Sequence, residues 1–226
     1  MAAPLRLSCV LLAALAALQP SSAQNFCNIS SCRSPSQHTM CRFTSSRVSR
    51  ACGAVRVSSV SAADRAEILR VHNDLRRAVQ RGAHRNRGLP AARYMPNLRW
   101  SSSLARIAQR WANQCQTGHD QCRNLPGKYV GQNFAWSGNQ AKDWRNRIAN
   151  AWFSSELPYV RSTLSNLKYR GGKAGHLTQI IWAKTTEIGC GYVETKRPRG
   201  RYVERFYFCN YGPGGNYYGQ RVYDPK

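Results

Sequence analysis

Apolar side chains recur every three or four residues between positions 61 and 81, which is the spacing of one buried face of an α-helix. The members of this face are Ile68, Val71, Leu75 and Val79. Ser61 and Asp64 are candidate N-caps, Glu67 stands at capping-box spacing from Asp64, and Gly82 follows the last apolar position. The pattern predicts a helix over residues 61–81. We expect His72, which lies within it, to be hydrogen-bonded in the interior rather than to act as a ligand.

Two later stretches have the same periodicity and predict two more helices. The first covers residues 101–115, and its inner face carries Leu104, Ile107, Ala108 and Trp111. The second covers residues 143–155, and its inner face carries Trp144, Ile148 and Trp152. A ladder of large aromatic residues at helical spacing is more typical of a core than of a ligand site.

Strands are predicted in the last third of the chain. Residues 175–191 are interpreted as a strand through Ile180-Ile181-Trp182, a polar turn, and a second strand held by Cys190. Residues 206–211 form an aromatic strand with a glycine- and proline-rich exit. Residues 192–203 are predicted to be two strands joined by a basic turn at 196–201.

The first 23 residues have the features of a secretory signal peptide. Arg6 precedes an apolar stretch at 10–18, and small residues follow at 21–23. The apolar stretch is too short to cross a bilayer, and no later stretch approaches membrane-spanning length. We therefore expect a secreted, extracellular protein without a transmembrane segment, with a cysteine-rich leader at 24–59 and one domain at 60–226.

Cys9 leaves with the signal peptide, so eight of the nine cysteines remain. An even number in an exported chain predicts a disulfide framework, although spacing alone does not fix the pairing. A metal cluster is the other interpretation, which the lack of a Cys-x-x-Cys pair disfavours. Asn28 begins an Asn-Ile-Ser sequon and is a candidate glycosylation site.

The formal net charge is +24, and most of the cations are arginines, which bind sulfate and phosphate groups with paired donors. Because the signal peptide disfavours intracellular nucleic acid as a partner, the charge indicates either extracellular polyanions such as heparin-like glycans or simply a solvated basic surface. The candidate polyanion-binding residues are Arg81, Arg85 and Arg87 in one segment and Lys196, Arg197, Arg199 and Arg201 in another.

Three polar residues are candidates for a site: His119 between two cysteines, Glu156 after a helix, and His176 before a predicted strand. Two imidazoles and a carboxylate are a common zinc ligand set with an open fourth position. Their separation in the sequence gives no evidence that they meet.

Several motifs together resemble the CAP superfamily of cysteine-rich secretory proteins, antigen 5 and pathogenesis-related type 1 proteins. They are Gly175-His176-Leu177-Thr178-Gln179, the segment from Cys209 to Asn216, His72-Asn73-Asp74, and Gly131-Gln132-Asn133. The resemblance is strongest to the antigen 5 proteins of arthropods and covers about residues 25–222.

The resemblance implies an α+β fold, a three-layer α-β-α sandwich, with a cleft of two histidines and two acids that binds a divalent metal in several members. The histidines match His119 and His176 and one acid matches Glu156, but Gln132 replaces the other acid. A glutamine cannot act as a general base and is a poor metal ligand. The resemblance also implies the disulfides Cys27–Cys41, Cys32–Cys122, Cys52–Cys115 and Cys190–Cys209.

These observations favour a secreted, non-catalytic antigen 5-like protein of venom, saliva or haemolymph that binds small lipids or sterols, host polyanions, or both. One alternative is a metal-assisted hydrolase that uses His119, Glu156 and His176, with zinc as the candidate cofactor. Another is a heparin-binding or antimicrobial effector whose affinity falls with salt. The three cleft residues could equally form a hydrogen-bonded network that only stiffens the fold.

Overall fold

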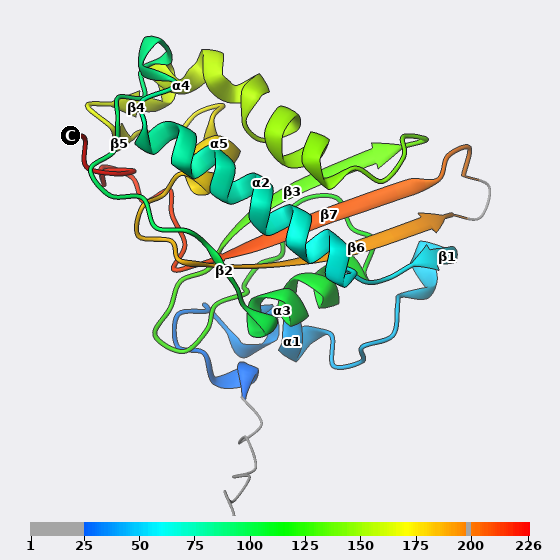
Figure 1. The fold of residues 1–226 in the computed structure, drawn as a ribbon. Helices are drawn as coiled ribbons and strands as arrows, with labels where there is room; N and C mark the ends of the chain where they lie inside the picture. The colour runs from blue at the N-terminus through cyan, green and yellow to red at the C-terminus, as the bar shows by residue number, and fades with distance from the viewer. Residues whose placement is uncertain (1–24, 198–199) are drawn as a thin grey trace, which may run out of the picture.

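The computed structural model describes residues 25–197 and 200–226 (Figure 1). The predicted signal peptide at residues 1–23 and the candidate residue Arg199 lie outside the described residues. Within the described part, no helix is both long and apolar enough to cross a membrane.

A five-stranded sheet forms the middle of the molecule. Its strands follow the antiparallel order β1–β6–β7–β3, and the short β2 pairs with β6 in parallel. The strands are β1 (Ala54–Val57), β2 (Arg99–Trp100), β3 (Gly131–Gly138), β6 (Glu187–Lys196) and β7 (Glu204–Gly212), with a separate ribbon of β4 (Leu164–Ser165) and β5 (Lys168–Tyr169). The predicted aromatic strand is β7, which a hairpin joins to β6.

Helices cover both faces of this sheet (Figure 1). One face carries α2 (Ala62–Gln80), the π-helix η5 (Asn146–Ala151), the 3₁₀-helix η6 (Ser154–Tyr159), α4 (Val160–Thr163) and α5 (Gly175–Ile180), and the other carries α3 (Ser102–Ala112). Successive residues of β7 pack into the two layers: Tyr207 contacts Trp144 in the layer that contains α2, and Phe208 contacts Trp111 of α3. The predicted three-layer α-β-α sandwich is confirmed.

The Gly-Cys-Gly segment of β6 explains how α3 lies so close to the sheet. Gly189 and Gly191 face α3, and a Cβ atom on either would overlap its backbone. Cys190 points to the opposite layer, where it stands in register with Cys209 and forms a disulfide. Because side chains alternate along a strand, one face of this segment allows α3 to pack closely, and the other carries the disulfide to β7.

The prediction of a strand at the start of residues 175–191 is wrong, because this segment is the helix α5. Its residues from Leu177 to Ile180 are all buried, so no polar face marks a helical period in the sequence. A short run of this kind cannot be assigned by periodicity alone. The second half of the segment is β6, as predicted.

The three predicted helices are present with shorter or altered bounds. Ser61 caps α2 in a capping box whose partner is Asp64 rather than a later acid. The third helix changes to π geometry at η5, and its inner residues Trp144, Ile148 and Trp152 are all buried in the core.

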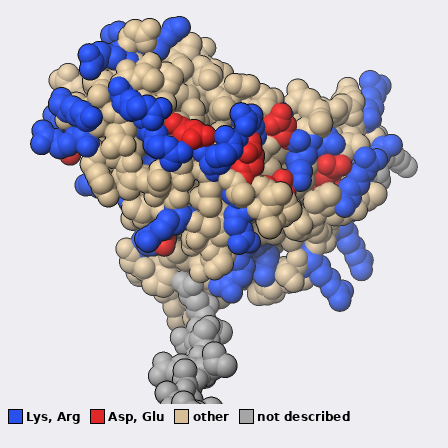
Figure 2. Space-filling model, in the orientation of Figure 1, with Lys and Arg blue, Asp and Glu red and all other residues tan. Residues whose placement is uncertain are grey.

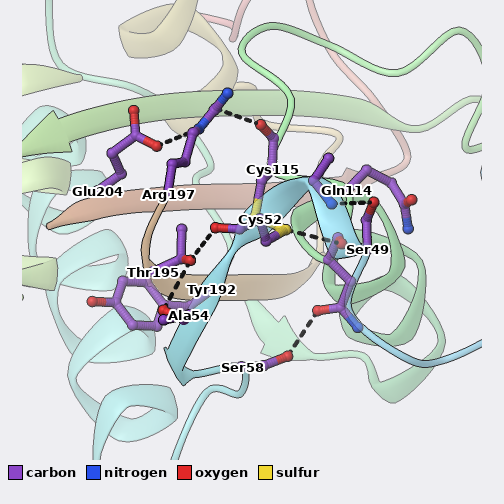
Figure 3. The surroundings of a disulfide bond; sticks show 12 residues. Ser49, Cys52, Ala54, Ser58, Gln114, Cys115, Tyr192, Thr195, Arg197 and Glu204 are labelled. Carbon is purple, nitrogen blue, oxygen red and sulfur yellow. Dashed lines mark hydrogen bonds and ion pairs between the residues drawn. A yellow bond between two sulfur atoms is a disulfide. The ribbon is translucent and has the colours of Figure 1, made fainter. Parts of the chain in front are cut away.

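The leader consists of short helical pieces, η1 (Phe26–Asn28), η2 (Pro35–Gln37), α1 (Thr39–Arg42) and η3 (Arg50–Cys52), followed by β1. The four disulfides are the pairs that the resemblance implies: Cys27–Cys41, Cys32–Cys122, Cys52–Cys115 and Cys190–Cys209. Two of them join the leader to the rest of the chain. Beside Cys52–Cys115, the Thr195 hydroxyl donates to the carbonyls of Cys52 and Ala54, which fastens the end of the leader to β6 (Figure 3).

A further turn follows α2, where the 3₁₀-helix η4 (Arg85–Arg87) reverses the chain. In Figure 1 this turn lies at the opposite end of the molecule from the β6–β7 hairpin. The helix α2 runs between the two ends, and its 19 residues span about 28 Å at 1.5 Å each.

Candidate functional site

The first half of the predicted cleft is a pair formed by His176 and Glu156. His176 lies in the first turn of α5, and its Nδ1–H donates to Oε1 of Glu156 in η6 at 2.6 Å. The second carboxylate oxygen accepts the backbone N–H of Leu177 at 2.8 Å. The Trp152 ring stacks beside the imidazole, with ring centroids 6.0 Å apart. Both oxygens of Glu156 are therefore occupied in holding His176 in place.

The second half pairs His119 with Gln132 at the start of β3. His119 Nδ1 lies 2.8 Å from Gln132 Oε1, and the amide nitrogen of Gln132 donates to Asp120 at 3.2 Å and to Asn210 at 3.0 Å. Because Asp120 and Asn210 present only oxygens, the glutamine nitrogen must face them and its oxygen must face the histidine. A neutral amide fits this position for a physical reason: a glutamate here would place a second carboxylate beside Asp120.

These partners fix the tautomer of both histidines. In each ring Nδ1 carries the proton and Nε2 is left with a lone pair. His119 is exposed, yet partial desolvation of its ring, together with the nearby charge of Arg123, lowers its pKa below the usual value.

The cleft has a volume of about 340 Å³, and sequence reasoning missed several side chains that line it: Asn133, Tyr169, Lys173 and Asn216.

A buried chain of hydrogen bonds supports the cleft from behind. His72 Nδ1 donates to the Ile68 carbonyl at 2.8 Å, so its Nε2 accepts from the Tyr211 hydroxyl, also at 2.8 Å. Asn133 donates to the same hydroxyl and to the His176 carbonyl. Burial lowers the pKa of His72 to about 4, so this residue is a neutral structural histidine, as predicted.

The donor set of the cleft does not complete a zinc site. His119 and His176 reach the same cleft, but the two oxygens of Glu156 accept hydrogen bonds from His176 Nδ1 and from the backbone N–H of Leu177. In the part of the chain that the structure describes, no three His, Cys, Asp or Glu side chains are grouped to hold a metal ion. Two imidazoles are only part of a tetrahedral ligand set. Zinc remains a prediction of the resemblance.

The cleft holds a base but no adjacent nucleophile. A histidine oriented by a carboxylate is the arrangement of a general base. Among the described residues that line the cleft there is no serine, threonine or cysteine to be activated. A water molecule would have to serve as the attacking group.

The first predicted polyanion segment lies on the turn after α2, which we call the basic turn (residues 81–88). Arg81, Arg85 and Arg87 are exposed, and none of them forms a salt bridge with a described residue. Arg161 from α4 joins them and donates to the Asn86 carbonyl at 3.3 Å. Figure 2 shows Lys and Arg gathered over this end of the molecule, while the acids form a band across its middle.

The second predicted segment, the tip of the β6–β7 hairpin, is different. Arg197 donates to Glu204 at 2.5 Å and to the Cys115 carbonyl at 3.0 Å (Figure 3). Its guanidinium also lies over the Phe206 ring. Lys196 and Arg201 are exposed. The structure therefore does not bring the two basic segments together, and it engages the central arginine of the hairpin within the fold.

Asn28, the candidate glycosylation residue, is the last residue of η1 and is exposed. Its side chain is therefore accessible to an attached glycan.

Comparison with known proteins gives a consistent result. The model of the cysteine-rich secretory protein family, CAP, matches residues 69–211. Venom allergen 5 of Brachyponera chinensis is 42% identical over 195 residues, which cover 82% of this chain and 96% of the relative. Venom allergen 3 of Solenopsis invicta is 39% identical over 221 residues, which cover 90% of this chain and 91% of the relative.

Solved structures agree with these sequence matches. The crystal structure of NaASP2 with Zn²⁺ has a TM-score of 0.60 at 27% identity and covers 74% of this chain and 88% of that one. The structure of BmVAL-1 has a TM-score of 0.59 at 28% identity, covering 77% and 87%.

Proposed function

The chain belongs to the CAP family of cysteine-rich secretory proteins, and we propose that it is a secreted, non-catalytic protein of the venom allergen type that captures extracellular polyanions on its basic turn. Secretion is supported by the venom allergen relatives and by four disulfides, which persist in oxidising compartments.

The observation that carries the polyanion proposal is that no carboxylate among residues 25–197 and 200–226 pairs with the arginines of the basic turn. Arg81, Arg85 and Arg87 are exposed on one turn, and Arg161 is exposed near it. Guanidinium groups that have no carboxylate partner pair readily with the sulfate or phosphate groups of a polymer, and the release of its counterions drives binding.

The proposal that the cleft is non-catalytic rests on its side chains. Gln132 cannot exchange a proton at neutral pH, and Glu156 is held by two hydrogen bonds. A small lipid or sterol remains an expectation of the family resemblance.

The test is calorimetric titration of the disulfide-intact protein with heparin fragments at several salt concentrations. We expect binding that weakens steeply with salt. Replacing Arg81, Arg85 and Arg87 by serine should lower affinity about tenfold and reduce the salt slope, by on the order of one for each lost contact.

The matched control replaces Arg197 of the hairpin, whose guanidinium is paired with Glu204, by serine and should change affinity less than about twofold. Salt-independent binding, or an equal loss in the hairpin control, would contradict the proposal.

The oriented pair of His176 and Glu156 favours one second candidate, a hydrolase that uses a bound water. Hydrolysis of ester or peptide substrates by the wild type that is abolished in the His176→Ala protein would support it. Activity that is equal in the two proteins would come from a contaminant.

A further inference from the structure

A second cavity lies away from the cleft. It is a groove of about 610 Å³ between three segments, residues 93–96, 183–186 and 220–224. It shares no lining residue with the cleft, and Arg81, Arg85 and Arg87 do not line it. Its volume lies within the range typical of small-molecule sites, about 300–1,000 Å³.

Backbone hydrogen bonds join the C-terminal segment to each of the other two walls. The N–H of Arg93 donates to the Asp224 carbonyl at 2.8 Å, and the N–H of Ala183 donates to the Val222 carbonyl at 2.8 Å. The groove is therefore not a gap between independently moving loops.

The buried Arg76 guanidinium joins the other two walls, residues 93–96 and 183–186, to each other. It donates to the Pro96 carbonyl at 2.8 Å and to the Thr185 carbonyl at 3.1 Å. Burial lowers its pKa to about 10, so the side chain is still charged at neutral pH. These hydrogen bonds pre-form the groove before any ligand arrives.

The lining combines an apolar interior with cations. Pro96, Ala183, Val222 and Tyr223 supply the apolar part, and the Tyr223 hydroxyl is already used, since it donates to the Pro90 carbonyl at 2.9 Å. Tyr94 also lines the groove and is 68% exposed. An exposed aromatic ring of this kind is a stacking surface for a planar ligand.

The charge of the groove selects for anions. Among the described residues that line it, the cations are Arg93, Lys184 and Arg221 and the only acid is Asp224. Asp224 lies 3.6 Å from Arg221, whereas Arg93 and Lys184 form no salt bridge with a described residue. A ligand that neutralises these two groups must carry a negative charge.

We propose that this groove binds a small aromatic anion, a planar ring system that carries a sulfate, sulfonate or phosphate group. The ring stacks on Tyr94 and covers the apolar interior, while the anionic group pairs with Arg93 and Lys184. This site is additional to the polyanion surface and does not rest on it.

The first experiment is calorimetric titration of the full protein with naphthalene-2-sulfonate. The two control ligands are naphthalene-2-methanol, which has the same ring without charge, and inorganic sulfate, which has the charge without the ring. We expect saturable binding of the sulfonate and at least tenfold weaker binding of both controls.

Variants then locate the binding. Tyr94→Ser should weaken sulfonate binding about tenfold, and Arg93→Gln and Lys184→Gln about threefold each. Two matched controls should leave it unchanged: Tyr218→Ser, an equally exposed tyrosine outside the groove, and Arg81→Gln on the basic turn. All these side chains are exposed, and an unchanged melting temperature confirms that each variant is folded.

Three results would overturn the proposal. They are equal binding of naphthalene-2-methanol, unchanged affinity in the Tyr94, Arg93 and Lys184 variants, and tighter binding of octyl sulfate, which would make the groove a site for a single alkyl chain. Heparin titration separates this proposal from the previous one, because Tyr94→Ser should bind heparin like the wild type.

Discussion

The basic turn after α2 and the tip of the β6–β7 hairpin are alike in sequence and different in structure. Both are short loops rich in arginine between regular elements. At the hairpin, Arg197 is bound to Glu204 and to a carbonyl beside the Cys52–Cys115 disulfide. At the basic turn, no described acid pairs with Arg81, Arg85 or Arg87. A cluster of cations in a sequence therefore says little about binding until the position of the acids is known.

The largest effect is expected when the disulfide at the hairpin end is removed. The bond joins residues 63 positions apart, so replacing Cys52 and Cys115 by serine should lower the free energy of unfolding by about 4 kcal/mol. Chemical denaturation measures the loss. Heparin affinity at a temperature where the variant is folded should be unchanged, because the basic turn lies at the other end. A parallel loss of affinity would show that the two ends are coupled.

The cleft resembles the hairpin in that its polar groups are bound to one another. Gln132→Glu would leave Asn210 without its donor and place a carboxylate beside Asp120, which should cost about 2 kcal/mol. The pKa of the new glutamate would be raised, so the loss should grow as pH rises through that value. Denaturation at pH 5 and pH 8 measures this change. Equal stability at both values would contradict the geometry, and Gln140→Glu on the exposed surface is the control.

A smaller effect is expected when Arg197 alone is replaced. Arg197→Ala loses its ion pair and the hydrogen bond to Cys115, and we expect a loss of about 1 kcal/mol, or about 2–4 °C in melting temperature. Arg85→Ala on the basic turn is the matched control and should not change the melting temperature. If the two variants behave alike, the contrast between the segments is wrong.

Glu204→Gln should make the hairpin tip more like the basic turn, because it removes the carboxylate that pairs with Arg197. Without the carboxylate, Arg197 is available to an external anion, and heparin affinity should rise about twofold. Titration with heparin at fixed ionic strength measures the change. The control is Glu187→Gln, which removes the partner of Lys128 outside the hairpin and tests whether the loss of any acid raises heparin affinity.

The smallest expected effect is that of pH on the basic turn. Its one histidine, His84, packs edge-on to Phe153 with ring centroids 5.2 Å apart, and burial lowers its pKa. A lowered pKa keeps the ring uncharged above about pH 6.5, so heparin affinity should be constant between pH 8 and 6.5. An affinity that rises over this range, and no longer does so in His84→Asn, would show that the histidine contributes charge.

Several features of the fold could be predicted from local sequence because their causes are local. The period of α2 and α3 and the alternation along β7 follow from which side chains face the core. The family motifs also placed His119, Gln132, Glu156 and His176 in one cleft, although residue spacing alone gave no evidence that they meet.

Tertiary structure decided the rest. Four successive residues of α5, Leu177 to Ile180, are all buried, so its sequence carries no periodic signal. The two residues that favour a glutamine at position 132 are Asp120 and Asn210, which accept hydrogen bonds from its amide nitrogen. They lie 12 and 78 residues away in the sequence, and nothing in the local sequence indicates that they contact it. The groove beside Tyr94 exists only because three separate segments meet, two of them joined by Arg76 and the third by backbone hydrogen bonds.

The sequence by itself determined the strongly basic charge, the pattern of helices and the cysteines available for bridges. Only the folded chain decided which cations have a carboxylate partner and which do not. The physical reason is that an ion pair forms between groups within a few ångströms, and for residues as far apart as Lys142 and Asp64 that proximity is set by packing rather than by the local sequence.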